Sequence, residues 1–513
     1  MNNATFNKDT HGIFRIVTPY SYNYYRILSL VHGIPLYSRN TLVDVDVSSN
    51  VQKCYFRIIV LKFLSLLSMC MLSTHLEAWH KMAKLKNLIA SSLILLSSVS
   101  FAAEQNLEYL PTAAQWAEHT SVLAKYWMHP DAQGVPLGNF PTWRCDDGTL
   151  RNQKSCKGEG SLGNMLELSG IDFVRMQARQ TFAYGVLFNL TGDEQALKLH
   201  KAGVDFLLKN ARDPEGGFYS LMKQGKPLTA DDHALPVKRL QRTSQDLSYA
   251  LVGLAMNAYL THDPEVIKVI MDSEKYIYDT YFDEKADLMR WCLEDSKSDK
   301  TTQKELVALL DQINAYMVLT LRLIPQDDKK AFVADLDKTV DSINNHFYNK
   351  DRNRFFGCID NKSCFDLKKG RHLDNGHTVK AFWMEYLVAC MTGNEKLKEF
   401  AKHGMLTTLQ SAQTDEHTNW YGDLLKKDAS WWEYAELDQS ALTLALTGDY
   451  ELQDTLRPWV NDYVDRQYGE LNHFGLKTFF WRNGFHSTEH ALIGTIMSSP
   501  QHANVHITSM VCS

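Results

Sequence analysis

From about residue 103 to the end of the chain, apolar residues recur every three or four positions. This spacing places them on one side of a helix, so it predicts amphipathic helices rather than strands. Each predicted helix ends on Gly, His or Pro, and an Asp or Asn that can cap a second helix follows soon after. The chain is therefore predicted to be a series of helical hairpins. The clearest first helices are Phe173–Leu190, Leu247–Leu260, Leu306–Leu323, Val379–Met391 and Glu436–Leu446, with turns near residues 192, 262, 325, 393 and 448.

The turns lie about 55 to 70 residues apart, which indicates an internal repeat, and roughly six such units fit in residues 103–513. Short strand-like segments lie between units, at Gly216–Tyr219, Arg354–Gly357 and Trp420–Gly422. Repeated hairpins form either open solenoids or closed rings. No linker rich in Pro, Gly or Ser divides the region. We therefore expect one all-α domain, an (α/α)6 toroid with short β segments in its loops.

Residues 82–102 have the features of a secretory signal peptide. Basic residues precede an apolar run at 88–96, and the small residues Ser100 and Ala102 fit a cleavage site. We expect translation to begin at Met82, so that residues 1–81 are a non-native extension and the mature chain is 103–513. The alternative is that the apolar runs at 58–71 and 88–96 anchor the protein in a membrane. On the first hypothesis the protein is periplasmic or secreted, and its mature chain makes no stable membrane insertion.

Cysteine positions agree with export. Two pairs lie within polar loops, Cys145 with Cys156 and Cys358 with Cys364. Local pairs of this kind are typical of disulfides in an oxidising compartment, and their spacings do not match zinc sites. Free surface thiols are the alternative for these four. Cys292 and Cys390 are expected to be buried thiols.

Charge and composition narrow the choice of ligand. The 54 Lys and Arg against 60 Asp and Glu leave a net charge of −6, so nucleic acid is not an expected partner. Aromatic residues make up 11% of the chain, which suits a carbohydrate or small-molecule site but also a large core.

Two short motifs lack the context that their usual chemistry needs. Gly158, Gly160 and Gly163 fit the G-x-G-x-x-G pattern, but they follow a polar segment rather than a buried strand. His486 and His490 fit H-x-x-E-H, but no Asp or Glu follows to complete a zinc site. We therefore expect neither a cofactor nor a metal.

Polar and aromatic side chains are concentrated at the starts of the predicted inner helices. If those helices line a toroid, the side chains converge on one end of its cavity. For each residue a structural role is the alternative: a helix cap, a core aromatic or an ion-pair partner. The set is His377, Lys380, Trp383, Trp431, Trp432, Glu436, His486, Glu489 and His490, with Arg175 and Arg179 on one face of the first inner helix.

At these residues the chain resembles the N-acylglucosamine 2-epimerase family. The likeness runs from about Trp116 to about Ser498. It implies an (α/α)6 barrel and a metal-free sugar epimerase or aldose–ketose isomerase that acts on a monosaccharide or disaccharide. A homodimer is a further expectation. The resemblance rests on Gln177-Ala178-Arg179, Gly376-His377, Trp431-Trp432 with Glu436, and Trp481 with Phe485-His486.

The resemblance also implies roles for single residues. His377 and His486 would be the acid/base pair that moves a proton beside the sugar carbonyl. Arg179 would stabilise the enediolate oxygen. In the rest of the substrate site, tryptophans would pack on sugar carbons and polar groups would bond hydroxyls, through Trp383, Trp431, Trp432, Glu436, Glu489 and His490.

Two positions depart from the family pattern. Lys380 stands where many members have Glu, and Tyr316 stands where many have His, after Asn314. Lys380 could depress the pKa of His377, bind an acidic sugar or face away. Both residues are assigned to the substrate site.

Two other functions remain open on the sequence. A toroidal glycoside hydrolase or lyase would need paired carboxylates, for which Asp246, Asp311, Glu436 and Glu489 are the candidates. A glycan-binding relative without catalysis would use the same cavity for recognition alone.

Overall fold

A computed structural model describes residues 110–151, 156, 170–228, 242–293 and 301–498. The chain divides into two compact units, Met1–Leu93 and Ile94–Ser513, and all described residues belong to the second. The expected extension at 1–81 and signal peptide at 82–102 lie outside the described residues. Within these residues, no helix is long and apolar enough to cross a bilayer.

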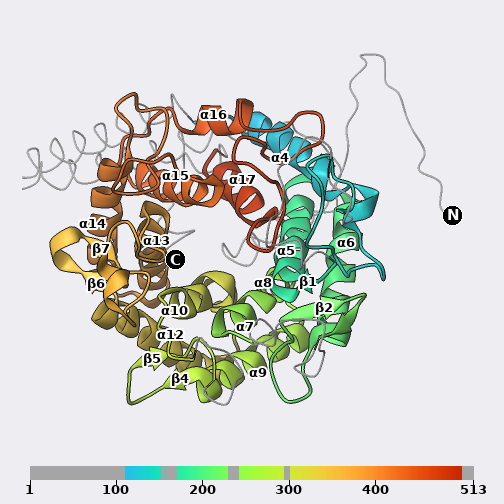
Figure 1. The fold of residues 1–513 in the computed structure, drawn as a ribbon, viewed down its shortest axis with the longest axis horizontal. Coiled ribbons are helices and arrows are strands. Elements are labelled where there is room, and N and C mark those ends of the chain that lie inside the picture. Colours follow the sequence, from blue (N-terminus) through green and yellow to red (C-terminus); the bar gives the residue numbers. More distant parts are fainter. Residues whose placement is uncertain (1–109, 152–155, 157–169, 229–241, 294–300, 499–513) are drawn as a thin grey trace, which may run out of the picture. The chain divides into compact units, whose positions relative to one another are not determined.

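The helices of the second unit form a closed ring of two concentric layers (Figure 1). The ring closes because the last inner helix, α17 (Phe485–Ser498), packs against the first, α5 (Val174–Thr191). This confirms the predicted (α/α)6 toroid. The other inner elements are α7 (Ser244–Ala250) with α8 (Val252–Thr261), α10 (Val307–Gln312) with the π-helical turn η5 (Ile313–Met317) and α11 (Val318–Thr320), α13 (Asn375–Thr392) and α15 (Trp431–Leu446).

The outer layer covers the inner helices on their far side. Inner helices are therefore buried almost all round, and in α5 every residue from Val174 to Leu187 is buried. An outer helix such as α9 instead buries one stripe and exposes the other, as expected for an amphipathic helix. The outer helices are α4 (Ala113–Trp127), α6 (Glu194–Phe206), α9 (Pro264–Tyr281), α12 (Gln326–His346), α14 (Glu395–Ala412) and α16 (Leu456–Asn461).

The predicted turn signals are confirmed at all five positions. Gly192, His262, Gly393 and Gly448 have positive φ at or just past the ends of inner helices, and Pro325 precedes α12. Side chains then cap the outer helices: Asp193 accepts from Gln195 N, and Asn394 accepts from Leu397 N. These local signals set the hairpin geometry because they satisfy the backbone groups that helix ends leave unpaired.

Short antiparallel strands lie in the loops at one end of the hairpins. They form the sheets β1–β2–β3, β4–β5 and β6–β7, in which Phe173 pairs with Leu221 and Tyr348 pairs with Phe355. Their bounds are β1 Asp172–Phe173, β2 Leu221–Lys223, β3 Lys226–Pro227, β4 Phe282–Asp283, β5 Leu288–Met289, β6 Tyr348–Asn349 and β7 Arg354–Phe355, and short 3-10 or π turns occur at Pro130–Ala132, Leu207–Ala211, Lys350–Arg352 and Lys362–Phe365.

Both predicted disulfides are present, Cys145–Cys156 and Cys358–Cys364. Cys292 is buried, as expected. The prediction of a buried thiol at Cys390 was wrong, because this residue is disulfide-bonded. Cys390 lies in a predicted inner helix rather than in a short loop with a second cysteine, so the spacing of cysteines in the sequence does not indicate a disulfide here.

Candidate functional site

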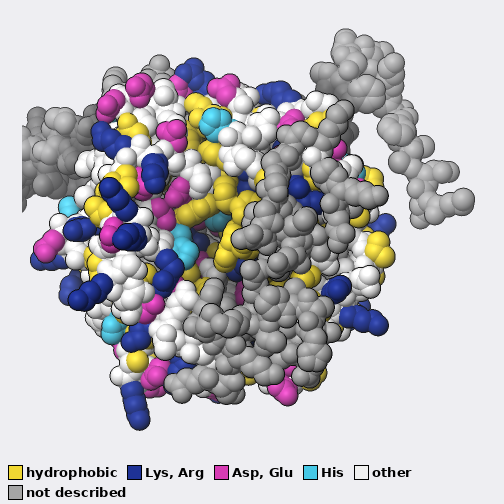
Figure 2. All heavy atoms as spheres, viewed as in Figure 1, with side chains coloured by type: hydrophobic (Ala, Val, Ile, Leu, Met, Phe, Trp, Pro, Cys, Tyr) yellow, Lys and Arg dark blue, Asp and Glu magenta, His cyan; other side chains and the backbone are white. Residues whose placement is uncertain are grey.

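Most of the candidate residues lie in the first two turns of the inner helices. His377 is the third residue of α13, Glu436 the sixth of α15 and His486 the second of α17. Inner helices of successive hairpins run in the same direction, so their starts meet at one end of the ring. Figure 2 shows hydrophobic side chains, with histidine beside them, gathered around the middle of the ring face.

His377 is held by the residue that caps its own helix. One oxygen of Asp374, Oδ1, accepts from the backbone N of His377 at 2.7 Å, and the other, Oδ2, lies 2.7 Å from His377 Nδ1. Burial opposes a charge on this imidazole, but the Asp374 carboxylate outweighs it and raises the pKa of His377 above its ordinary value. Asp374 thus favours the imidazolium form and leaves Nε2 as the nitrogen free for chemistry.

The pKa of His486 is shifted in the opposite direction, below its ordinary value. Its Nδ1 lies 3.4 Å from Glu436 Oε1 and 4.0 Å from Glu489 Oε2. Burial nevertheless dominates and lowers the pKa of His486 to about 4, so the ring is neutral near pH 7. Burial, and then the charge of Glu436, raise the pKa of Glu489 to about 8.

Trp432 lies between the two histidines. Its ring centroid is 4.5 Å from that of His377 and 6.2 Å from that of His486. Gly376 makes this approach possible, because a Cβ there would lie 2.8 Å from Trp432 Cζ3 and 2.7 Å from Glu433 Cγ. Glycine at position 376 is therefore explained by close packing against Trp432, and His377 by its chemistry.

Lys380 does not face away from the site. Its Nζ donates to Asp311 Oδ1 at 3.1 Å and lies 3.8 Å from Glu436 Oε1. Burial alone would lower the pKa of Lys380, but Tyr249, Asp311 and Glu436 outweigh it and raise that pKa. Burial likewise opposes the charge on Asp311, yet Lys380 and its other partners lower the pKa of this carboxyl. The pair is charged, and it links α10, α13 and α15.

Two arginines of α5 complete the ring of polar groups. Arg179 lies over the Tyr249 ring, 3.8 Å from its centroid, and donates to Trp481 O at 3.3 Å. Arg175 forms an ion pair with Asp246 at 3.1 Å and stacks on Trp481 at 3.9 Å. Arg175 is therefore an ion-pair partner, while Arg179 has its guanidinium among aromatic rings.

Four of the predicted substrate-site residues have their polar or ring contacts elsewhere. Trp383 donates to Thr443 at 2.9 Å, and Trp431 contacts Phe479 and lies under Arg482. Tyr316, on the π turn, donates to Gln312 and packs against Phe332 of the outer layer. His490 bonds to Asp438 at 2.9 Å and contacts Trp459. Each side chain therefore has a partner within the described part of the protein, although Trp431 Nε1 and His490 Nδ1 have no hydrogen bond there.

One group of side chains has a metal-like geometry. Glu436, His486 and Glu489 each offer a ligand atom within 4.8 Å of the others. The ammonium of Lys380 near Glu436 opposes a second cation there, and His490 does not join the group because it bonds to Asp438. Among the residues that the structure describes, Cys358, Asp360 and Cys364 form another such cluster, but its two sulfurs are in a disulfide.

Sequence reasoning missed residues that support the catalytic candidates. Asp374, three residues before His377, is a helix cap by spacing alone, and the same spacing could have suggested a partner for the histidine. Tyr249, which donates to Asp311 at 2.9 Å, and His372, whose ring lies 4.5 Å from His377, had no signal in the pattern. Their roles depend on contacts between separate elements.

Comparison with known proteins identifies the family. The family model of N-acylglucosamine 2-epimerase (GlcNAc 2-epimerase) matches residues 169–470. No match is found among curated protein sequences.

Solved structures share the fold. A sugar epimerase from a ruminal bacterium has a TM-score of 0.54 at 16% identity, covering 78% of this chain and 99% of its own. A D-mannose isomerase has a TM-score of 0.57 at 12% identity, covering 74% and 97%. The cellobiose 2-epimerase of Bacillus thermoamylovorans B4167 has a TM-score of 0.57 at 12% identity, covering 75% and 98%. With its family model matched over more than half of its length, the chain belongs to the N-acylglucosamine 2-epimerase family.

Proposed function

We propose that this protein is a sugar 2-epimerase or aldose–ketose isomerase in which His377 and His486 transfer the proton. One observation carries the proposal. Two histidines flank the same tryptophan, and their environments push their pKa values in opposite directions. A pair of titratable groups tuned apart in this way is typical of an acid and a base that work together.

The chemistry needs such a pair. In an open-chain aldose the C2–H bond breaks, the proton goes to Nε2 of neutral His486, and the electron pair forms the C1–C2 double bond of an enediolate. The imidazolium of His377 then donates its Nε2 proton to the opposite face of C2, giving the epimer. Delivery to C1, with transfer of the O2 proton to O1, gives the ketose. Exchange with solvent restores both histidines to their starting states.

The enediolate is an anion, and the surrounding groups suit it. Arg179 brings a guanidinium to the site. The starts of α5, α13, α15 and α17 add partial positive charge from unpaired backbone N–H groups. Electrostatic stabilisation of this kind is worth about 3–4 kcal/mol for a single donor in other enzymes.

The class of substrate is inferred from the basic side chains near the site that already have acidic partners. Lys380 is paired with Asp311 and Arg175 with Asp246, so neither is left for a sugar carboxylate. We therefore assign a neutral monosaccharide or disaccharide, with Trp432 against sugar carbons and Glu436 available to hydroxyls. Both proton carriers are side chains, so the proposed reaction is metal-independent, and dialysis against EDTA should leave it unchanged.

The test is proton exchange in D2O. The protein is incubated with aldoses, N-acetylhexosamines and disaccharides, and the C2 proton is followed by NMR. We expect loss of this signal, with interconversion, in the wild type and in His403→Asn, which changes an exposed histidine of α14. His377→Asn and His486→Asn should each abolish both. A folded protein that exchanges no C2 proton in any sugar contradicts the proposal.

Cleavage of a glycosidic bond without exchange would instead favour the hydrolase. Asp246 and Asp311 are held in ion pairs at 3.1 Å, whereas Glu436 is 3.8 Å from Lys380. Glu436 and Glu489, both beside His486, are therefore the candidates for that reaction. Changing both to Gln should then remove cleavage.

We also propose that the protein is exported to the periplasm or secreted, with cleavage after Ala102. Two disulfides in loops support this, because such bonds persist in oxidising compartments. N-terminal sequencing of the protein from its natural host should begin at Ala103, and a cytoplasmic, uncleaved product contradicts export.

A further inference from the structure

We propose that His372 is a positioning residue for His377, and that the disulfide-closed loop Cys358–Cys364 holds His372 in place. The inference rests on the proposed role of His377 in proton transfer. It concerns residues outside the set that the sequence assigned to catalysis.

His372 fixes one side of the His377 ring. The two ring centroids are 4.5 Å apart with planes at 63°, and Trp432 makes a contact of the same distance and angle. Asp374 holds Nδ1. The imidazole of His377 thus has three neighbours, and removal of any one allows it to rotate.

His372 adopts a backbone conformation that needs support. Its φ is 49°, in the left-handed region that is unfavourable for a residue with a side chain. The support is Gly357, whose absent Cβ would lie 2.1 Å from Arg371 O and 2.3 Å from His372 Cβ. The backbone just before Cys358 therefore packs directly against the backbone of 371–372.

A chain of charged contacts joins His372 to the loop. Arg371 donates from Nε to Glu305 Oε1 at 2.7 Å and from an Nη to Asp360 Oδ1, also at 2.7 Å. Glu305 is buried, and its second oxygen, Oε2, lies 3.9 Å from His372 Nε2. Arg371 thus connects Asp360, inside the loop, with the carboxylate that faces His372.

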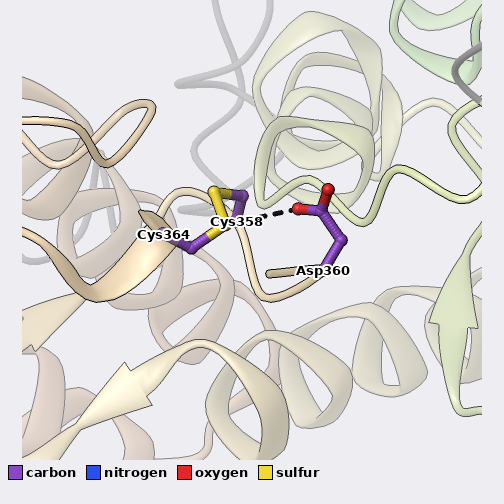
Figure 3. A group of neighbouring side chains, drawn as sticks. All are labelled: Cys358, Asp360 and Cys364. Carbon is purple, nitrogen blue, oxygen red and sulfur yellow. Dashed lines mark hydrogen bonds between the residues drawn. A yellow bond between two sulfur atoms is a disulfide. The ribbon is translucent and has the colours of Figure 1, made fainter. Parts of the chain in front are cut away.

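The disulfide lies beside both carboxylates that Arg371 joins, Asp360 and Glu305. Figure 3 shows Asp360 beside the Cys358–Cys364 bond, with its Oδ1 3.3 Å from Cys364 Sγ. Glu305 forms a backbone bridge with Cys358, while Gly370 packs against Cys364 O, 2.6 Å from the position of an added Cβ. Opening the loop therefore frees Asp360, Arg371 and the segment before His377 together.

The experiment compares two of the disulfides in the full-length protein, Cys358–Cys364 and Cys145–Cys156. Cys358→Ser/Cys364→Ser removes the loop closure. Cys145→Ser/Cys156→Ser is the matched control, because the hydrogen bonds of the described residues in and beside its loop run to α4, Asp131, Lys477 and Thr478. Each variant is labelled with 15N-histidine, and the Nδ1 proton of His377 is followed by NMR, assigned by its loss in His377→Asn.

Opening the 358–364 loop should broaden or remove the His377 signal and lower kcat by about 10- to 100-fold. KM should change by less than about twofold, since binding groups are untouched. The control should keep the signal and kcat. His372→Ala should repeat the loss, and adding it to the opened loop should have little further effect, because both act on one contact.

Conservative replacement separates positioning from proton transfer. His372→Phe keeps a ring against His377 but carries no proton, so it should retain most of kcat. An inactive His372→Phe with a normal His377 signal would overturn the positioning role. An unchanged His377 signal after the loop is opened would show that the disulfide does not hold His372 in place. This outcome counts against the proposal whether or not the protein turns over sugars.

Discussion

At the scale of single residues, Asp374 has two functions that separate cleanly by substitution. One oxygen caps α13 and the other sets the charge of His377. An asparagine keeps an oxygen for the cap but removes the negative charge.

Asp374→Asn should shift one limb of the pH profile. The proposed reaction needs neutral His486 and protonated His377, so the wild-type rate should rise near pH 4 and fall above the ordinary histidine pKa of 6.5. Without the carboxylate, burial is the main influence left on His377 and its pKa falls. The alkaline limb should therefore move to lower pH while the acid limb stays. The check is kcat/KM for exchange from pH 3 to 10, and movement of the acid limb would contradict the assignment.

The buried pair of Lys380 and Asp311 gives a stability prediction. Lys380→Met leaves the Asp311 carboxylate in the protein interior without its cation, which should cost about 3–5 kcal/mol in the free energy of unfolding. Adding Asp311→Asn should recover part of the loss, because no unpaired charge remains. Urea unfolding measures both, with the exposed Lys396→Met as control. A single variant as stable as the wild type would mean that the ammonium is not needed there.

The sequence predicts which residues belong to the site better than it predicts which of them contact one another. The helical period places Lys380 on the same helix as His377, but only the fold places Asp311, 69 positions earlier, 3.1 Å away. Tyr316 sits on a π turn, which rotates its side chain toward the outer layer, and no spacing rule anticipates that turn. The sequence thus finds the inner helix starts, and tertiary contacts decide which side chains meet.

At the scale of elements, the contact between α13 and α15 depends on the absence of one side chain. Gly376→Ala would ordinarily favour a helix by about 1 kcal/mol. Here the new Cβ would meet Trp432 and the Glu433 backbone at under 3 Å, so the two helix starts must separate. We expect no gain in stability and a fall in kcat, measured by urea unfolding and proton exchange. A variant that is more stable and fully active would show that α13 and α15 have room for a methyl group at position 376.

The helical hairpins themselves were the most predictable elements. Their stop and cap signals are local, and Gly192, His262, Pro325, Gly393 and Gly448 all mark helix ends. Two features were not predicted. The third inner helix is interrupted at Ile313–Met317, and the last outer helix is only Leu456–Asn461.

At the scale of the whole ring, closure brings the first and last elements into one cluster. Glu470 is buried and accepts from Trp127 Nε1 of α4 at 2.6 Å and from Ser487 Oγ of α17 at 2.8 Å. The repeat predicted either an open or a closed array, and this contact exists only in the closed one. In an open solenoid, a defect in the last unit would loosen that unit alone.

Glu470→Ala should therefore loosen both ends of the described chain. It leaves the buried Trp127 Nε1 without its acceptor, at about 1–3 kcal/mol, and leaves Ser487 Oγ only its bond to Gly484 O at 3.2 Å. Hydrogen exchange should quicken in α4 and α17 together, and in α5, which packs against both. Glu395→Ala, at the exposed start of α14, should leave exchange in all three helices unchanged. If only α17 exchanges faster, the two ends unfold independently and the ring does not behave as one cooperative unit. Matched increases in all three helices mean that closure stabilises the ring as a whole, including the site residues near the starts of α5 and α17.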